Sequence, residues 1–581
     1  MDDAARPTVH RPWAARPDLR ALTAALRKGC RLAASAWVAC ALAAPCLAST
    51  APDEVRSALR ERVAQWRAAD GGANAHRRPP VAAHKLLASF YERRAFAPAW
   101  TQAQPLRALA ELVDAAPDHG LEPGDYHAEA VHAALVGPAP DAWAAADRDL
   151  LMTDALVRLA YHLHFGKANP RELYPGWNFS RQLSGREPVA VLEALISGPD
   201  LRAGVQAFAP RMAMYTALMD ALRDHRAMAA RGGWPRLEAG PALREGMTGA
   251  RVQHLRERLA ASGDTLARPA PLVGPEDFDG TLAEAVRRFQ SRHGLAPDGV
   301  VGRETQQALD IGVAQRIEQL RVNLERLRWV AQDLHGDYLL VDVAGFSAQL
   351  YEDDRLAWTS RVTVGRPYRR TPSLRTSVTA IVLNPTWTVP PTILREDLLP
   401  KLARDPAHLA ALQLRVTDRA GRPVDPATVD WSRYRGAARG FPYQLVQPPG
   451  RLNPLGELKF VLSNSQAIYL HDTPDKTQFG RASRALSSGC IRVERAHQLA
   501  VRLLDDPEQW SPEALREAIA RGRTTTVALP RELPVMLLYF TARAEEGQVL
   551  FHPDLYGRDP QVLAALRAPV RLAPVDPPPQ R

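Results

Sequence analysis

One pair of side chains in the sequence is suited to covalent catalysis, Cys490 and His471. The stretch "ALSSGCIRV" places the cysteine directly after three small residues, and the histidine stands 19 residues earlier. A free thiol is only slightly ionised at neutral pH, and an adjacent imidazole can remove its proton. Small residues before a nucleophile permit a tight turn whose backbone N–H groups converge on a developing oxyanion. These residue types predict acyl chemistry through a thioester, provided that the fold brings the two side chains together.

The remaining cysteines lie in an expected export signal. A basic segment ending at Arg31 precedes 17 uncharged residues, "LAASAWVACALAAPCLA", and small residues follow. This order is typical of a signal peptide, which we place at residues 1–48. An uncleaved membrane anchor is the alternative, because about 17 apolar residues is the lower limit for a span. Cleavage would leave Cys490 as the only thiol, since the other cysteines are Cys30, Cys40 and Cys46.

Length and composition indicate the number of domains and the broad class of the protein. The 581 residues are too many for one hydrophobic core and predict several domains. A hydrophobic content of 46% and a charged content of 24% are ordinary for a globular protein. The net charge of +10 is not gathered into a basic stripe with interleaved aromatic residues, so no nucleic-acid partner is predicted.

Strand-like segments surround the Cys–His pair. Alternation in "QAIYLHDTP" predicts a strand with Tyr469 and His471 on one face and Ile468 and Leu470 on the other. Hairpin-like strands begin near Tyr338, and an amphipathic helix, "VERAHQLAVRLLDD", follows the cysteine. We therefore expect a mostly β catalytic domain over residues 335–510. A Pro-punctuated, helix-rich stretch at 390–442 is longer than an ordinary connection and predicts a capping insertion, and residues 511–581 read as a C-terminal extension with a Pro-rich end.

The region before the catalytic domain is predicted to be helical. Residues 52–235 show helical periodicity with Pro and Gly breaks, as in "DALVRLAYHLHFGK", and we interpret them as a scaffold. Residues 240–312 predict three short helices and an Asp298-Gly299 turn. The sequence "FDGTLAEAVRRFQSRHGLAPDGVVGRETQQAL" there resembles the peptidoglycan-binding domain found beside many cell-wall enzymes. That resemblance implies binding to glycan or stem peptide, with a simple spacer as the alternative.

The stretch "HDTPDKTQFGRASRALSSGCIRV" resembles the catalytic signature of the L,D-transpeptidases. The Ser-Ser-Gly-Cys variant, together with "FYERRAFAPAW", "VGRPYRRTP" and "NPTWTVP", is similar to the large periplasmic members of Gram-negative bacteria. The resemblance implies Cys490 as nucleophile and His471 as general base. It further implies an oxyanion hole formed by the backbone amides of Ser488, Gly489 and Cys490. Residues on the substrate side would be Arg492, Tyr469, Ser487 and Trp387.

The expected architecture is therefore a multidomain α+β fold. It joins a helical scaffold and a three-helix peptidoglycan-binding domain to a mostly β L,D-transpeptidase catalytic domain with a helical capping insertion. The resemblance implies 3-3 cross-linking of peptidoglycan stem peptides by acyl transfer. Two alternatives stay open, hydrolysis by the same site and a catalytically silent wall-binding scaffold. What orients His471 is undecided between a nearby carbonyl and the Asp472 side chain.

The sequence and the resemblance also give expectations for the cofactors, the location and the partners of the protein. No HExxH motif, paired cysteines or clustered carboxylates at ligand spacing occur in the sequence, so neither a metal site nor a cofactor is predicted. The expected location is the periplasm. The implied partner is peptidoglycan, through its glycan strands and stem peptides, and other wall synthases are further candidates.

Overall fold

The computed structural model describes residues 52–68, 79–183, 185–265, 274–434, 440–545 and 547–576. The predicted signal peptide at 1–48 lies outside these ranges. Within them, no helix has both the length and the apolar character that a bilayer crossing requires.

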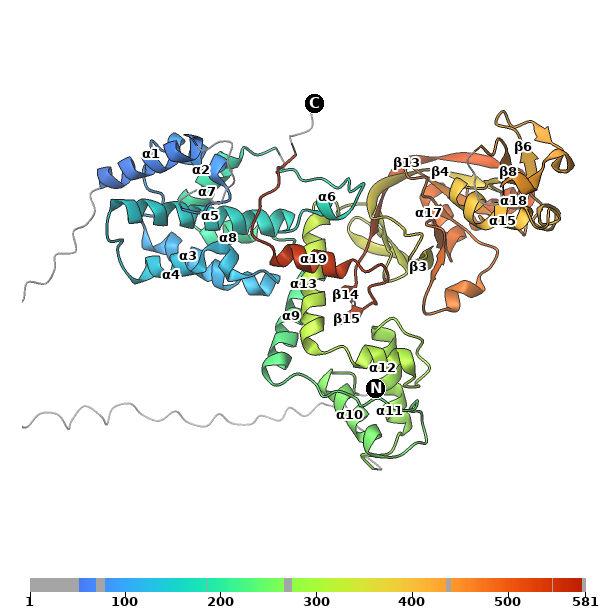
Figure 1. Cartoon of the computed structure of the whole chain (residues 1–581), viewed down its shortest axis with the longest axis horizontal. Coiled ribbons are helices and arrows are strands. Elements are labelled where there is room, and N and C mark those ends of the chain that lie inside the picture. The colour runs from blue at the N-terminus through green and yellow to red at the C-terminus, as the bar shows by residue number, and fades with distance from the viewer. Residues whose placement is uncertain are drawn as a thin grey trace, which may run out of the picture. The chain divides into compact units, whose positions relative to one another are not determined.

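Helices make up the first part of the described chain, as the periodicity predicts (Figure 1). The longest is α5 (Ala142–Phe165), whose N-cap Asp141 accepts a hydrogen bond from the Ala144 N–H. Leu156, Leu159 and Leu163 of α5 are buried in one hydrophobic core that also contains residues of α1 (Pro52–Ala68). The other helices of this region are α2 (His84–Arg93), α3 (Ala103–Asp114), α4 (Ala128–Val136), α6 (Pro170–Leu173), α7 (Pro188–Ser197), α8 (Leu201–Gln206) and α9 (Ala213–Ala230).

Three helices follow with a small core of their own. They are α10 (Ala250–Ala261), α11 (Gly280–Arg292) and α12 (Arg303–Leu309). Phe289 fills this core, as its helical spacing predicts. The predicted turn is present: Gly299 has a φ of +78°, and its N–H donates to the Gln290 side chain at 2.9 Å. The longer helix α13 (Val313–Val330) then leads to the sheet.

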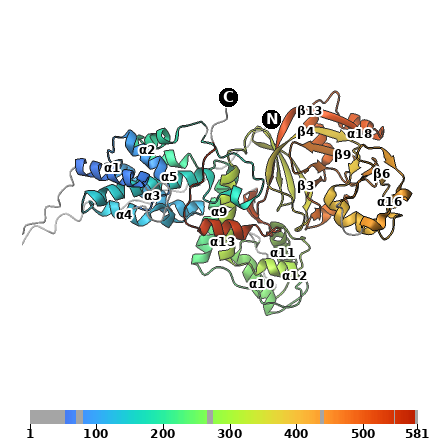
Figure 2. The same ribbon diagram turned by 45° about the horizontal axis from the view of Figure 1, so that its top comes forward.

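A nine-stranded mixed sheet forms the centre of the catalytic region. Its strand order is β11-β3-β12-β10-β9-β4-β13-β1-β2, and Figure 2 shows β4, β9 and β13 as neighbours. The predicted first hairpin is present, with β1 and β2 antiparallel. The nine strands are β1 (Tyr338–Asp342), β2 (Ser347–Glu352), β3 (Arg355–Gly365), β4 (Leu374–Leu383), β9 (Leu458–Leu462), β10 (Leu470–His471), β11 (Ala485–Ser487), β12 (Ile491–Val493) and β13 (Thr525–Leu538).

Strand β13 continues the central sheet beyond residue 510, the predicted end of the catalytic domain. It pairs with β4 in antiparallel and with β1 in parallel orientation, so it is an interior strand of the sheet and not part of an extension. The reason is its apolar second half, Val535 to Leu538, which is buried between neighbouring strands. Beyond it lie β14 (Ala542–Glu545), β15 (Gln548–Phe551) and α19 (Asp559–Arg567), while α17 (Ala496–Leu504) and α18 (Pro512–Ala520) precede it.

A second sheet accompanies the predicted helices of the capping insertion, with two strands inside residues 390–442 and two that flank them. Its strands β5 (Trp387–Thr388), β8 (Gln444–Gln447), β6 (Arg415–Thr417) and β7 (Pro423–Val424) pair in that order, apart from the central sheet. A core that includes Leu402 and Trp431 lies inside the insertion. The helical part includes α14 (Pro391–Ile393), η4 (Leu394–Leu398), α15 (Leu399–Leu402), α16 (His408–Ala411), η5 (Pro426–Thr428) and η6 (Trp431–Tyr434). The two internal strands were not predicted, because each has only two or three residues.

Candidate functional site

Two adjacent parallel strands bring the predicted catalytic residues to one face of the sheet. In the register of β10 and β12, Leu470 lies opposite Ile491 and His471 lies opposite Arg492. Leu470 and Ile491 are fully buried in the core of the domain. Because side chains alternate along a strand, His471 and Arg492 occupy the other face. Cys490 lies on that face too, two residues before Arg492 and directly ahead of β12. After His471 the chain forms a long loop and then pairs with β10 again as β12. The thiol of Cys490 therefore lies beside the strand that carries the histidine.

The thiol of Cys490 lies in a partly buried position beside Tyr469. Burial raises the pKa of Cys490 above the ordinary value of a thiol. Hydrogen bonding to the backbone and side chain of Tyr469 lowers it, and so do the positive charges of Lys459 and Arg492. The Sγ atom also lies 3.9 Å from the carbonyl oxygen of Ala467. In the resting protein the cysteine is therefore mainly the neutral thiol, surrounded by groups that favour its charged form.

His471 is held in one tautomer by its own chain. Its Nδ1 lies 2.5 Å from the backbone carbonyl oxygen of Asp472. A carbonyl can only accept, so the proton is on Nδ1 and the lone pair is on Nε2. Burial lowers the pKa of His471 to about 3, and the positive charge of Arg492 acts in the same direction. The ring is therefore neutral and can accept a proton through Nε2.

The carbonyl, not the carboxylate, is the orienting group that the sequence left undecided. The Asp472 carboxylate is engaged elsewhere, since it accepts from the Glu457 N–H at 3.0 Å and forms an ion pair with Lys476.

No hydrogen bond joins the Cys490 thiol to the His471 ring in the described structure. The two side chains lie diagonally across the β10–β12 ladder, with the Tyr469 ring centroid 5.7 Å from that of the histidine. Catalytic hydrogen bonds often tighten only when substrate is bound. The arrangement holds a neutral thiol and a neutral imidazole, so proton removal would accompany nucleophilic attack.

The turn before the nucleophile leaves two backbone N–H groups unused. The Gly489 N–H donates to the Ser487 hydroxyl at 3.0 Å, and that hydroxyl donates to the Cys490 carbonyl at 2.6 Å. Gly489 has a φ of +121°, which residues with a side chain rarely adopt. Among described residues, no partner engages the N–H groups of Ser488 and Cys490. The predicted oxyanion hole stays a prediction, now centred on these two amides.

The residues predicted to face substrate separate into two groups. Trp387 lies close enough to the Tyr469 side chain to lower its pKa, and Tyr469 in turn lies beside the thiol. Arg492 donates to Gln478 at 2.7 Å, while its Nε is buried without a partner. Ser487, by contrast, is buried and uses its hydroxyl inside the turn, where its proton is already donated to the Cys490 carbonyl.

Two cations near the nucleophile were not singled out from the sequence. Lys459 of β9 lies 4.4 Å from the Tyr469 ring centroid and lowers the pKa of Cys490. Arg369 donates to the Ser488 hydroxyl at 2.8 Å and forms ion pairs with Glu396 and Asp397 of the insertion. The motif "VGRPYRRTP" contained Arg369, but only the fold reveals that it connects the insertion to the nucleophile turn.

Three protein families match the chain. Residues 85–222 match a scaffold domain, residues 248–309 match a family described as "Putative peptidoglycan binding domain", and residues 336–518 match the YkuD L,D-transpeptidase catalytic domain. The two predicted catalytic residues both lie inside the third match.

Two curated proteins share parts of the sequence. A protein of Haemophilus influenzae named "Putative L,D-transpeptidase" is 38% identical over 273 residues, which cover 46% of this chain and 54% of that protein. The N-acetylmuramoyl-L-alanine amidase CwlM of Mycobacterium tuberculosis is 42% identical over 80 residues, which cover 13% of this chain and 20% of the amidase. The chain thus spans about half the length of the first relative and a fifth of the second.

Solved structures of two L,D-transpeptidases also match. The enzyme from Xylanimonas cellulosilytica is 15% identical, with 52% of this chain and 99% of that chain covered and a TM-score of 0.17. The enzyme from Stackebrandtia nassauensis is 12% identical, with 52% and 96% covered and a TM-score of 0.19. With TM-scores this low, neither likeness carries weight for the fold.

Proposed function

We propose that this chain, whose residues 336–518 form an L,D-transpeptidase catalytic domain, cross-links peptidoglycan stem peptides by acyl transfer through Cys490. The observation that carries the proposal is the shared sheet face of Cys490 and His471, with the histidine neutral and its Nε2 available as a base. The family match supports the reaction class, and the site supports the assignment of its two groups.

The proposed first half-reaction forms a thioester. Cys490 Sγ attacks the carbonyl carbon of the L,D peptide bond of a tetrapeptide stem, and its proton passes to His471 Nε2. The N–H groups of Ser488 and Cys490 are placed to stabilise the oxyanion. When the tetrahedral intermediate collapses, the C–N bond breaks and the leaving D-alanine amine takes the proton from His471. A ring with a pKa of about 3 gives up that proton readily.

The proposed second half-reaction regenerates the thiol. The side-chain amine of a diaminopimelate residue on a second stem attacks the thioester carbonyl and loses a proton through His471. The C–S bond then breaks, the proton returns to Cys490, and a 3-3 cross-link remains. No cofactor enters this balance. Hydrolysis would follow the same path with water as acceptor, and a capping insertion that excludes water favours transfer.

We further propose that the protein acts on the wall after export to the periplasm. The match of residues 248–309 to a peptidoglycan-binding family supports binding to the polymer that the catalytic domain modifies. Other wall synthases are proposed partners on the same ground.

Defined muropeptides provide the test. The protein is incubated with a disaccharide tetrapeptide, and products are identified by mass spectrometry beside the variant Cys490→Ala. A cross-linked dimer that has lost one D-alanine, absent with Cys490→Ala, is the expected result. Only a shortened tripeptide would assign hydrolysis to the site. Equal turnover by Cys490→Ala would overturn the role of the thiol.

A further inference from the structure

A buried threonine holds the nucleophile turn to the end of strand β3. Thr371 Oγ1 donates to the Gly489 carbonyl at 2.7 Å and accepts from the Gly365 N–H at 2.9 Å. Its side chain is completely buried. On the same strand end, the Arg366 N–H donates to the Ser487 carbonyl at 3.1 Å. The carbonyl immediately before Cys490 is thus fixed by one hydroxyl group.

A tyrosine from the C-terminal segment holds that threonine. The Tyr556 hydroxyl donates to the Gly365 carbonyl at 2.6 Å and accepts from the Thr371 N–H at 3.1 Å. Tyr556 is buried, and its ring is stacked on Tyr539 with centroids 5.4 Å apart. The backbone of Gly365 packs so closely on Arg369 that a side chain at this position has no room. The contact therefore lies in the protein interior, between the end of β3 and the segment that leads into β4.

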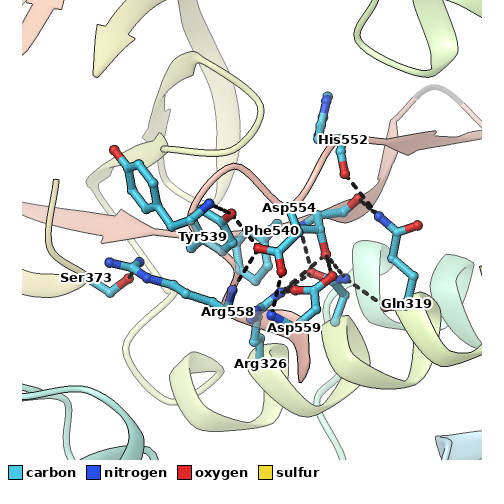
Figure 3. Close-up of polar contacts among 12 residues, drawn as sticks. Gln319, Arg326, Ser373, Tyr539, Phe540, His552, Asp554, Arg558 and Asp559 are labelled. Carbon is cyan, nitrogen blue, oxygen red and sulfur yellow. Dashed lines mark hydrogen bonds and ion pairs between the residues drawn. The ribbon is translucent and has the colours of Figure 1, made fainter. Parts of the chain in front are cut away.

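The segment that carries Tyr556 is itself fixed by a buried polar network (Figure 3). Asp554 accepts from the Tyr539 hydroxyl at 2.7 Å and from the backbone N–H of Arg558 at 2.9 Å. The Arg558 side chain donates to Ser373 at 3.1 Å and to the Thr371 carbonyl at 3.2 Å. Asp559 forms an ion pair with Arg326 of α13 at 2.6 Å.

We infer that the C-terminal segment 553–559 is part of the catalytic apparatus, with Tyr556 and Thr371 as positioning residues for the Cys490 turn. The segment lies outside residues 336–518, so the nucleophile is positioned by a part of the chain beyond the family match. Because Thr371 sets the Gly489 carbonyl, it also sets the direction of the adjoining Cys490 N–H, one of the two amides proposed to stabilise the oxyanion. The inference rests on the proposed role of Cys490 as the nucleophile.

Two reactions of the Cys490 thiol can distinguish a variant with a misplaced turn from a variant that is only less stable. Acylation by a carbapenem requires Sγ and the backbone amides in register, whereas alkylation by iodoacetamide requires only an accessible thiolate. Thr371→Val removes the hydroxyl without changing the shape of the side chain, and Tyr556→Phe removes the second hydroxyl. Thr371→Ser retains the bonding oxygen. Tyr91→Phe is the matched control, since it removes a buried hydroxyl that is bonded to Asp149 in the helical scaffold.

Acylation of Cys490, followed by intact-protein mass spectrometry, is expected to slow about 10²-fold in Thr371→Val and Tyr556→Phe, as small misplacements of reacting groups do. Alkylation should change far less, Thr371→Ser should restore acylation, and Tyr91→Phe should acylate as the parent protein does. Thermal unfolding identifies any variant that fails to fold. If either Thr371→Val or Tyr556→Phe does not fold, the acylation rate of the other variant tests the inference. Parent-like acylation of a folded Thr371→Val or Tyr556→Phe overturns the inference. A parent protein that is not acylated at Cys490 would count against the proposed function instead.

Discussion

The Nδ1 atom of His471 lies 2.5 Å from the backbone carbonyl oxygen of Asp472, so the residue that orients the catalytic ring does so without its side chain. A backbone acceptor cannot be removed by substitution, and it keeps the lone pair on Nε2 as long as β10 holds its place in the sheet. The arrangement gives the histidine a fixed tautomer, and burial lowers its pKa more than the nearby charge of Asp472 raises it. The ring is a weak base that stays neutral near pH 7, with Nε2 free to accept a proton.

Substitution of His471 should remove the base and leave the thiol in place. We expect His471→Ala to slow acylation by about 10²–10⁴-fold, the usual contribution of a general base. Asp472→Asn is the matched comparison, because it keeps the backbone carbonyl and an oxygen that can accept from the Glu457 N–H. Acylation kinetics measured on both variants should show a large loss only in the first. An equal loss in Asp472→Asn would assign the orienting role to the carboxylate.

A carbapenem should form one stoichiometric adduct with this protein. A thiolate attacks the strained β-lactam carbonyl as it would attack a stem peptide, and the same amides hold the resulting thioester. Intact-protein mass spectrometry should show a single mass increase that disappears in Cys490→Ala, while the variant unfolds at the parent temperature. An adduct that persists in Cys490→Ala would contradict the assignment.

The pH dependence of alkylation should reflect the burial of the thiol. Because the pKa of Cys490 is raised, the thiolate fraction at neutral pH is below that of a free cysteine and grows above about pH 8.5. The iodoacetamide rate should therefore keep rising beyond that pH. Lys459→Met removes a positive charge that lowers this pKa, so its profile should shift to still higher pH. A rate that levels off below pH 8 in the parent protein would disprove the expected shift.

The link between the capping insertion and the nucleophile turn should affect the choice of acceptor. Asp397→Ala removes an ion pair with Arg369, which also donates to Ser488. We expect a higher ratio of hydrolysed to cross-linked product, because a looser insertion admits water to the thioester. Asp405→Ala serves as control, because this exposed carboxylate of the same insertion contacts its sequence neighbours Ala407 and His408 and not Arg369. Identical product ratios in all three proteins would show that this link does not exclude water.

Residues 240–310 should be needed for wall binding more than for chemistry. Replacing them with a short Gly/Ser linker removes α10, α11 and α12 together with their separate core. Pelleting with isolated sacculi is expected to fall, while turnover of small muropeptides is retained. Equal pelleting of both proteins would reduce the three-helix unit to a spacer.

Most of the local structure could be predicted because it follows from local patterns. Helical spacing identified α5 and the three-helix unit, and alternation identified the first hairpin and the face of β10 that carries His471. The presence of a sheet strand beyond residue 510 could not be predicted in this way. The place of β13 between β4 and β1 depends on pairing with strands about 150 and 200 residues away, and a sequence records no such register.

The sequence by itself determined which groups could perform the chemistry: one thiol, one imidazole 19 residues earlier, and small residues that allow a tight turn. Only the tertiary structure decided how these groups are held. The parallel pairing of β10 with β12 places both on one face, the carbonyl of Asp472 selects the tautomer, and Tyr556 reaches Thr371 beside the turn. These contacts join segments far apart in the chain or use backbone atoms that every residue has. Side-chain identity alone cannot specify these contacts, because the atoms that make them come together only when the sheet has formed.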